Sequence, residues 1–230
     1  MRSCHFILSL ILSMTIAMTG CTQDKQTPAP SGGNGSLLLK AAAVNDTAVI
    51  RQLLEGKADI AARDNKQRTA LMLATYNHHT AAAALLIAAG ADVNAQDDIL
   101  NSPFLYAGAE GYSDILQLCL KAGANYKIYN RYGGTALIPA CERGHVEVVR
   151  TLLQDKTFPI DHVNRLGWTG LLEAIILSNG GPAHIQIVQM LVDAGCNVNL
   201  ADKDGVTPLA HARQRGFKEI AGILERTGAK

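Results

Sequence analysis

One stretch near the end of the chain decides the fold: DKDGVTPLAHARQRGFKEIAGIL, residues 202–224. Gly205 predicts a tight turn, because glycine adopts positive φ without steric cost. Thr207 and Pro208 predict a helix start, since a hydroxyl can cap a helix and proline fits its first position. Gly216 predicts the end of that helix. A second short helix follows, and its apolar stripe at helical spacing is formed by Ile220, Ile223 and Leu224. A unit of this size cannot bury its stripe alone, so it requires similar units beside it.

Five more copies of this unit precede it. The Thr or Ser that opens each first helix serves as a register mark, at Ser36, Thr69, Ser102, Thr135, Thr169 and Thr207. By subtraction, the marks are 33, 33, 33, 34 and 38 residues apart. Nine residues after the mark stands a residue suited to a turn, namely Asn45, His78, Gly111, Gly144 and Gly216, while the fifth copy is displaced by an insertion. A period of this length predicts a solenoid in which each repeat contacts only its neighbours.

Three copies close with Gly-Ala-Asp-like runs at residues 90–94, 123–125 and 195–199. Together with the period, these motifs resemble the ankyrin-repeat family from Ser36 to about Gly228. The resemblance implies an all-α solenoid of six helix-turn-helix repeats, joined by short β-hairpin loops, over residues 36–230. The family's Thr-Pro-Leu-His run is never complete here, and Thr207-Pro208-Leu209 is one of its nearest approaches.

The first 20 residues predict a signal peptide, with one cation at Arg2 and an apolar run from Phe6 to Met18 that is too short to span a bilayer comfortably. The run ends at Met18-Thr19-Gly20-Cys21, which resembles a bacterial lipobox and predicts lipidation at Cys21. Ordinary cleavage, with Cys21 as a bystander, is the alternative. Residues 21–35 are rich in Pro, Gly and Ser and predict a flexible tether.

The composition and the spacing of residues give no support to a catalytic site, a metal site or a nucleic-acid-binding site. The chain has 21 basic and 20 acidic residues without a Lys/Arg cluster, which argues against nucleic acid as a partner. Cys119, Cys141 and Cys196 stand at family core positions and are expected to be buried, with a Cys119–Cys141 disulfide as the alternative. Neither Cys-x₂-Cys nor His-x₃-His occurs, so no metal site is expected. We therefore expect no catalytic residue, cofactor or small-molecule substrate.

The resemblance implies a concave strip formed by the hairpin tips and the exposed face of each first helix. Trp, Tyr and Arg on this strip are the residue types that dominate protein interfaces. The candidate partner-binding residues are Lys66, Arg68, Tyr76, Ile99, Arg131, Tyr132, Arg143, Arg165, Leu166, Trp168 and Arg215. The insertion at residues 178–184 is expected to lengthen the turn of the fifth copy by five residues, either as a second contact surface or as a tolerated loop.

These observations favour a membrane-tethered, non-catalytic protein-protein interaction module in the bacterial cell envelope. The lipid at Cys21 would hold it on the periplasmic face of a membrane. Thr22 after the cysteine favours the outer membrane. A secreted effector or inhibitor is the alternative. The chain also resembles exported bacterial ankyrin proteins, some of which are encoded beside catalases. This resemblance implies a second alternative, an accessory role in oxidative-stress defence.

Overall fold

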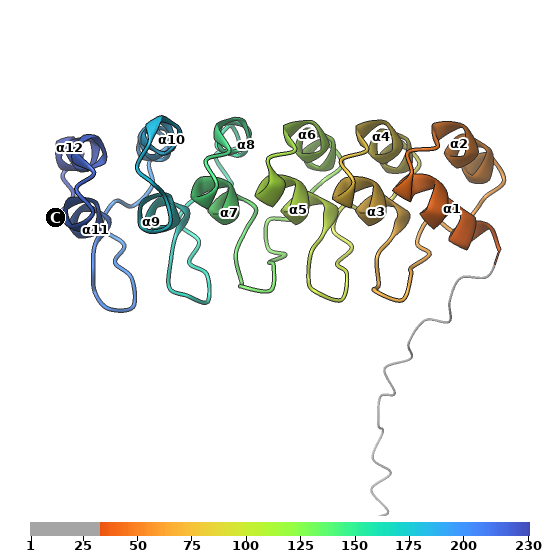
Figure 1. The fold of residues 1–230 in the computed structure, drawn as a ribbon, viewed down its shortest axis with the longest axis horizontal. Coiled ribbons are helices and arrows are strands. Elements are labelled where there is room, and N and C mark those ends of the chain that lie inside the picture. Colours follow the sequence, from red (N-terminus) through yellow and green to blue (C-terminus); the bar gives the residue numbers. More distant parts are fainter. Residues whose placement is uncertain (1–32) are drawn as a thin grey trace, which may run out of the picture.

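The computed structural model describes residues 33–230, which form one row of helix pairs (Figure 1). The signal peptide, Cys21 and the tether up to residue 32 lie outside the described residues. Every regular element between residues 33 and 230 is a helix, so the predicted all-α class is confirmed; the hairpin-shaped loops between repeats are turns with no strand residues. The helices are α1 (Asn34–Ala43), α2 (Thr47–Glu55), α3 (Ala70–Tyr76), α4 (Thr80–Ala88), α5 (Pro103–Glu110), α6 (Ser113–Lys121), α7 (Leu137–Glu142), α8 (Val146–Leu152), α9 (Gly170–Ile176), α10 (Pro182–Asp193), α11 (Pro208–Gln214) and α12 (Lys218–Arg226).

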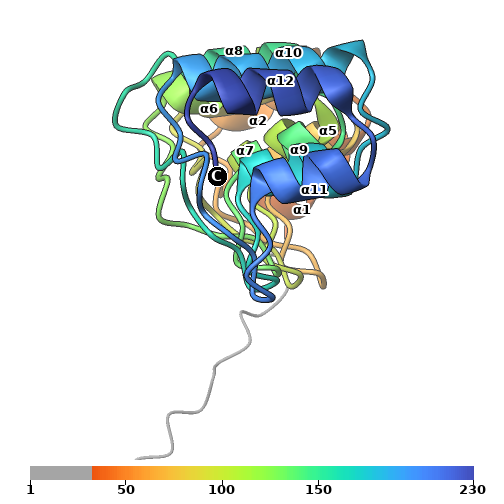
Figure 2. The same ribbon diagram turned by 90° about the vertical axis from the view of Figure 1, so that its left-hand side faces the viewer.

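The helices form two layers, with the hairpin loops projecting from one of them. Viewed from the end of the array, the first helices of the repeats (α1 to α11, odd numbers) lie next to the loops and the second helices cover them (Figure 2). Each helix packs on its partner within the repeat and on the equivalent helix of the next repeat. This nearest-neighbour packing is that of a solenoid, as the period of the sequence predicts.

One continuous apolar core runs between the two layers, from Leu38 in the first repeat to Leu224 in the last. The three cysteines of the repeats lie in it, as expected: Cys119 and Cys141 are completely buried and Cys196 is 9% exposed. All three are free thiols, so the alternative of a Cys119–Cys141 disulfide is wrong for this structure. The thiols therefore serve as small apolar side chains.

Four of the six register marks cap a helix as predicted. The side chains of Thr69, Ser102, Thr169 and Thr207 each accept a hydrogen bond from the backbone N–H three residues later, at 3.2–3.3 Å. The turn residues nine positions later also fit: Asn45 and His78 have φ of 58° and 54°, and glycine fills the other three positions. The pattern read from the sequence thus corresponds to real caps and turns.

The other two marks differ from the prediction. Ser36 lies inside α1, which begins at Asn34, so the helix takes up the last two residues of the predicted tether. Thr135 does not cap α7, because Pro139 stands four residues later, where its ring would collide with the Thr135 carbonyl and has no N–H to offer it. The helix therefore begins at Leu137, and the buried Thr135 hydroxyl has no hydrogen-bond partner.

The insertion in the fifth copy is taken up partly by a helix. The sequence predicts a turn lengthened by five residues, but α10 begins at Pro182, and its 12 residues make it the longest helix of residues 33–230. Proline suits this first position because its missing N–H would be unpaired there anyway. The remaining loop packs on the last repeat, with Gly180 at φ 65° facing the Phe217 ring.

Two glycines in helix interiors predict opposite effects of the same substitution. A Cβ at Gly108 in α5 would lie 2.7 Å from the Ala136 Cβ and 3.1 Å from its carbonyl oxygen, whereas at Gly222 in α12 it would approach only the flexible end of Arg226, at 3.4 Å. Alanine raises helix propensity at both sites by about 1 kcal/mol. We expect Gly222→Ala to stabilise the protein by about 0.5–1 kcal/mol. Gly108→Ala should destabilise it by about 1 kcal/mol, because overpacking outweighs propensity. Urea unfolding of both variants measures the two changes, and equal shifts would contradict the close packing of α5 on Ala136.

Candidate functional site

Each of the five hairpin loops is organised by one Asp or Asn, five residues before the register mark. Its Oδ1 accepts hydrogen bonds from the backbone N–H groups two and four residues later, at 2.9–3.1 Å. These residues are Asp64, Asp97, Asn130, Asn164 and Asp202. Asx side chains favour such turns because they can replace a backbone acceptor. Sequence analysis missed these residues, although an Asp or Asn five residues before each register mark is a pattern that the sequence shows.

The second polar atom of that residue selects a chemically matched partner. In four of the five hairpins an Asp pairs with a donor or an Asn with an acceptor, and three of these pairs join the hairpin to a helix of its own repeat or of the one before it. The pairs are Asp64–Arg68 at 2.6 Å, Asp97–Tyr76 at 2.5 Å, Asp202–His211 at 2.7 Å and Asn164–Glu173 at 2.8 Å. The hydrogen bonds from the Val206 backbone N–H and from the His211 imidazole lower the pKa of Asp202. The hairpins of Asp97, Asn164 and Asp202 are thus fixed to helices, as a recognition surface requires.

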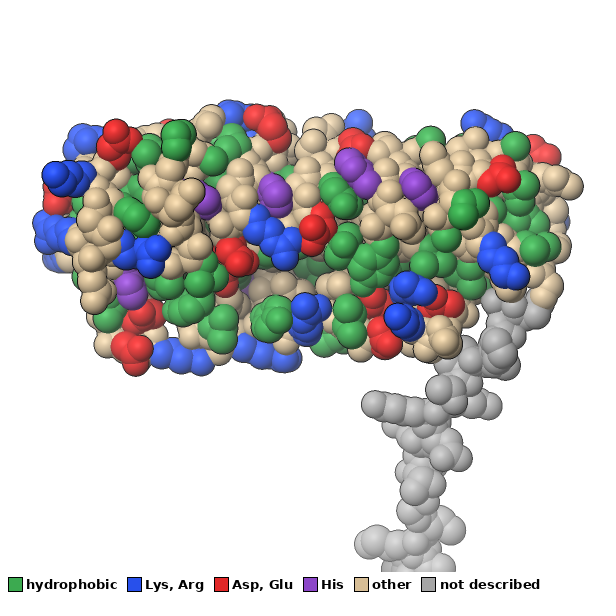
Figure 3. Space-filling model, viewed as in Figure 1, with side chains coloured by type: hydrophobic (Ala, Val, Ile, Leu, Met, Phe, Trp, Pro, Cys, Tyr) green, Lys and Arg blue, Asp and Glu red, His purple; other side chains and the backbone are tan. Residues whose placement is uncertain are grey.

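A pocket of about 490 Å³ opens on this face between the third, fourth and fifth repeats. The fourth repeat has the small residues Gly134 and Pro139 in the lining of this pocket, next to Ala109 of the third repeat. Figure 3 shows the hollow near the middle of the array, with hydrophobic, basic and acidic side chains around it. Five of the predicted binding residues line this pocket: Arg131, Tyr132, Arg143, Leu166 and Trp168.

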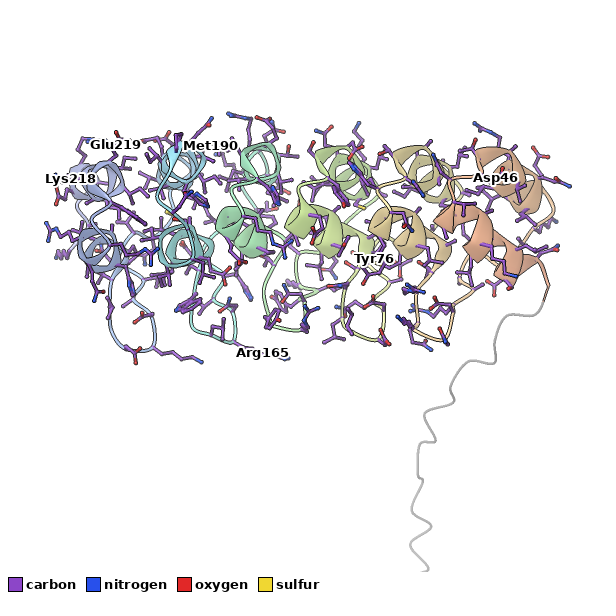
Figure 4. All side chains as sticks on the ribbon, in the orientation of Figure 1. Asp46, Tyr76, Arg165, Met190, Lys218 and Glu219 are labelled. Carbon is purple, nitrogen blue, oxygen red and sulfur yellow. The ribbon has the colours of Figure 1, made fainter. Side chains whose placement is uncertain are left out.

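The other predicted residues lie outside the pocket. The tip residues Lys66 and Ile99 are exposed, Ile99 to 46%. Tyr76 is the last residue of α3, and its hydroxyl also accepts a hydrogen bond from Asn101 of the next hairpin. Arg165 lies at a hairpin tip (Figure 4). Three of the arginines make intramolecular bonds: Arg68 to Asp64, Arg165 to the Arg131 carbonyl, and Arg215 to the Ser178 carbonyl over the Phe217 ring. The structure therefore concentrates the candidate site on the third to fifth repeats.

Sequence analysis missed the side chains four residues after the mark, which face the same hollow. In the third, fourth and fifth repeats these are Tyr106, Pro139 and Glu173. Glu173 is only 5% exposed, and burial and the neighbouring Glu142 raise its pKa to about 7, against the opposing effect of Asn164. A buried carboxyl on an exposed face of the array is the least expected feature of the site.

Two charge contacts arrange the rim of the pocket. Arg143 binds Glu110 at 2.5 Å and also donates to the Ala109 carbonyl at 2.8 Å. Arg131 places its guanidinium 4.9 Å from the centre of the Tyr132 ring. The rim is therefore amphipathic, with aromatic and guanidinium groups in contact.

The remaining nucleophile and base candidates do not assemble a reactive group. Burial raises the pKa of the Cys119 and Cys196 thiols to about 12 and that of Cys141 well above its ordinary value, which keeps all three protonated. His145 lies four residues after Cys141, and burial lowers its pKa. Within residues 33–230 no group of three His, Cys, Asp or Glu could hold a metal ion.

Two further features of the described residues bear on partners. None of the helices between residues 33 and 230 has the length and hydropathy needed to cross a membrane. A second hollow, about 630 Å³, lies between the outer helices α10 and α12 and contains no residue of the predicted strip.

Comparison with known proteins agrees with the repeat architecture. A family model described as ankyrin repeats (three copies) matches residues 6–97 and 104–202. The chain belongs to the ankyrin repeat family. It is 40% identical over 191 residues to the ankyrin repeat protein YahD of Escherichia coli (strain K12), covering 83% of this chain and 95% of YahD. Ankyrin repeat domains are generally non-catalytic and typically bind other proteins.

Solved structures share the whole array. An ankyrin repeat domain from Acinetobacter baumannii AYE is 57% identical and superposes with a TM-score of 0.82, over 84% of this chain and 98% of that one. The ankyrin repeat domain of Bcl-3, a member of the IκB family, is 26% identical with a TM-score of 0.75, over 84% and 86% of the two chains. The six-repeat ankyrin fold predicted from the period is thus confirmed.

Proposed function

We propose that this protein is a membrane-tethered, non-catalytic module of the bacterial cell envelope, which binds a protein partner on its concave strip. The observation that carries the proposal is the pocket between the third and fifth repeats. Trp168, Tyr132 and Arg143, from three separate segments of the chain, meet around it. Aromatic and arginine side chains around a hollow form the kind of site in which binding energy concentrates.

The tether rests on the sequence. The apolar run at residues 6–18, followed by the lipobox-like Met18-Thr19-Gly20-Cys21, supports export and lipidation. An acylated cysteine with several buried chains would anchor the protein stably, because each buried methylene contributes about 0.8 kcal/mol. The array would then stand off the periplasmic face of a membrane by the length of the Pro/Gly/Ser-rich segment.

Cross-linking in intact cells, followed by recovery from the membrane fraction, tests this function. We expect a protein partner to be recovered with the native chain and lost with a Trp168→Ala, Arg131→Ala double variant, because both substitutions remove contact area from the pocket. An Arg150→Ala, Gln154→Ala variant on the outer layer serves as the matched control and should recover the partner normally.

Two results would contradict parts of the proposal. Equal recovery with the pocket variant would move the contact to the loop at residues 178–184 or to the outer layer. A chain found in the medium and absent from the membrane fraction would exclude the lipid anchor and favour the secreted effector or inhibitor.

A further inference from the structure

Two carboxylates in the pocket have no cationic partner within residues 33–230. Glu142, at the end of α7, and Glu173, in α9, both line the pocket, and neither forms an ion pair there. The Asn164 amide bonds to Oε1 of Glu173, and among the described residues no hydrogen bond reaches Oε2. The residue as a whole is only 5% exposed, but Oε2 is not among the fully buried atoms that lack a partner, so this oxygen meets solvent at the pocket and is open to a ligand.

The cations nearby are already engaged or lie at the rim. Arg143, directly after α7, is bound to Glu110. On the other side, Asp202 binds His211 of α11, and the Ser178 carbonyl accepts a hydrogen bond from Arg215, directly after α11. Arg131 lies on the Tyr132 ring at a hairpin tip. None of these groups neutralises the two carboxylates in the described structure.

The walls of the pocket suit an organic cation. Trp168, Tyr132 and Tyr106 line it together with the two carboxylates. Aromatic faces attract a guanidinium or ammonium group, and the attraction increases when the group is desolvated. Carboxylates form the strongest hydrogen bonds with the same groups. The volume of about 490 Å³ exceeds that of one side chain, which leaves room for the flanking backbone of a protein loop.

We propose that the pocket receives a lysine or arginine side chain of the protein partner, with its cationic group on Glu142 and Glu173 and its stem against Trp168. The inference rests on the proposed function and specifies its partner: a protein that presents an exposed basic residue on a protruding segment. The occupied site would complete the hydrogen bonding of Glu173. Because the bound cation requires Glu173 to be ionised, the affinity should rise with pH around neutrality.

Tryptophan fluorescence of the full chain tests the inference, because Trp168 is its single tryptophan. The probes are N-acetylated, C-amidated pentapeptides with one central arginine, lysine, citrulline or glutamate between alanines. We expect a saturable change with the arginine or lysine peptide and none with citrulline, which is uncharged but similar in shape to arginine. Binding of the arginine peptide should tighten between about pH 6 and about pH 8.

Substitutions locate the contact. Glu173→Gln keeps an acceptor for Asn164, and Glu142→Gln changes a half-buried position, so both should fold as the native chain does. Each should weaken the arginine peptide about tenfold, and Glu173→Gln should also abolish the pH dependence. Glu147→Gln, on the outer helix α8, is the matched control and should bind normally.

Two outcomes would overturn the inference. Equal binding of the citrulline and arginine peptides, or unchanged binding by both glutamine variants, would show that the carboxylates do not recognise a cation. Binding of free spermidine more tightly than any peptide would assign the pocket to a small molecule. In either case, loss of the cross-linked partner with the Trp168→Ala, Arg131→Ala variant would still support the proposed function, so that the two failures are distinguishable.

Discussion

Leu116→Ala is expected to lower the free energy of unfolding by about 2–5 kcal/mol. Leu116 in α6 is completely buried in the core that joins the two helix layers, and it lies in the third of six repeats. Removing its side chain leaves a cavity that the helices of the neighbouring repeats can close only partly. Urea unfolding followed by circular dichroism measures the change.

The position of Leu116 within the array explains why its effect should be large. A solenoid is stabilised by interfaces between neighbours, so a central defect weakens two of them. Leu224→Ala, at another completely buried position in the last helix, should instead loosen the terminal repeat and broaden the transition. Leu37, 49% exposed in α1, is the control, and Leu37→Ala should change stability by less than about 0.5 kcal/mol. A loss below about 1 kcal/mol for Leu116→Ala would contradict the continuous core.

The sequence predicted what every repeat shares. The period, the capping residues and the glycines report the copied unit, and each repeat must satisfy the same local rules to stack. The buried cysteines were predictable for the same reason, since they occupy core positions of the unit. Thr135 shows the limit of this reasoning: the register was correct, but Pro139 four residues later overrides the cap.

The candidate site could not be predicted in the same way, because it depends on how the repeats differ. The pocket exists where the fourth repeat has Gly134 and Pro139 in place of larger side chains. Glu173 faces it from a position that holds Leu73, Tyr106 or His211 in other repeats. Only the three-dimensional stacking shows that these departures from the pattern are adjacent. Position 164 holds Asn because its amide donates a hydrogen bond to the Glu173 carboxyl, which an Asp could not do when both groups are ionised.

Glu173→Gln is expected to stabilise the protein at pH 8 by roughly 2 kcal/mol and to change little at pH 5. In the folded chain burial and Glu142 raise the pKa of Glu173 to about 7, whereas its ordinary value is 4.5. Between these two values the folded chain holds a proton that the unfolded chain releases. Stability contributed by the protonated form is therefore present below about pH 4.5 and is lost as the pH rises towards 7. Glutamine imitates the protonated carboxyl at every pH, so the variant avoids this loss.

Melting temperatures of the native chain and the variant, measured at several values between pH 5 and pH 8, check this prediction. The difference between the two chains isolates Glu173, because other groups such as His145 titrate in both. Glu147→Gln, whose carboxyl is exposed on α8, should leave the pH profile unchanged. Parallel profiles for the native chain and Glu173→Gln would mean that the carboxyl is ionised at no cost, and hence that the protein itself supplies a cation there. The pocket would then be complete without a partner, so this stability measurement also bears on what the concave strip binds.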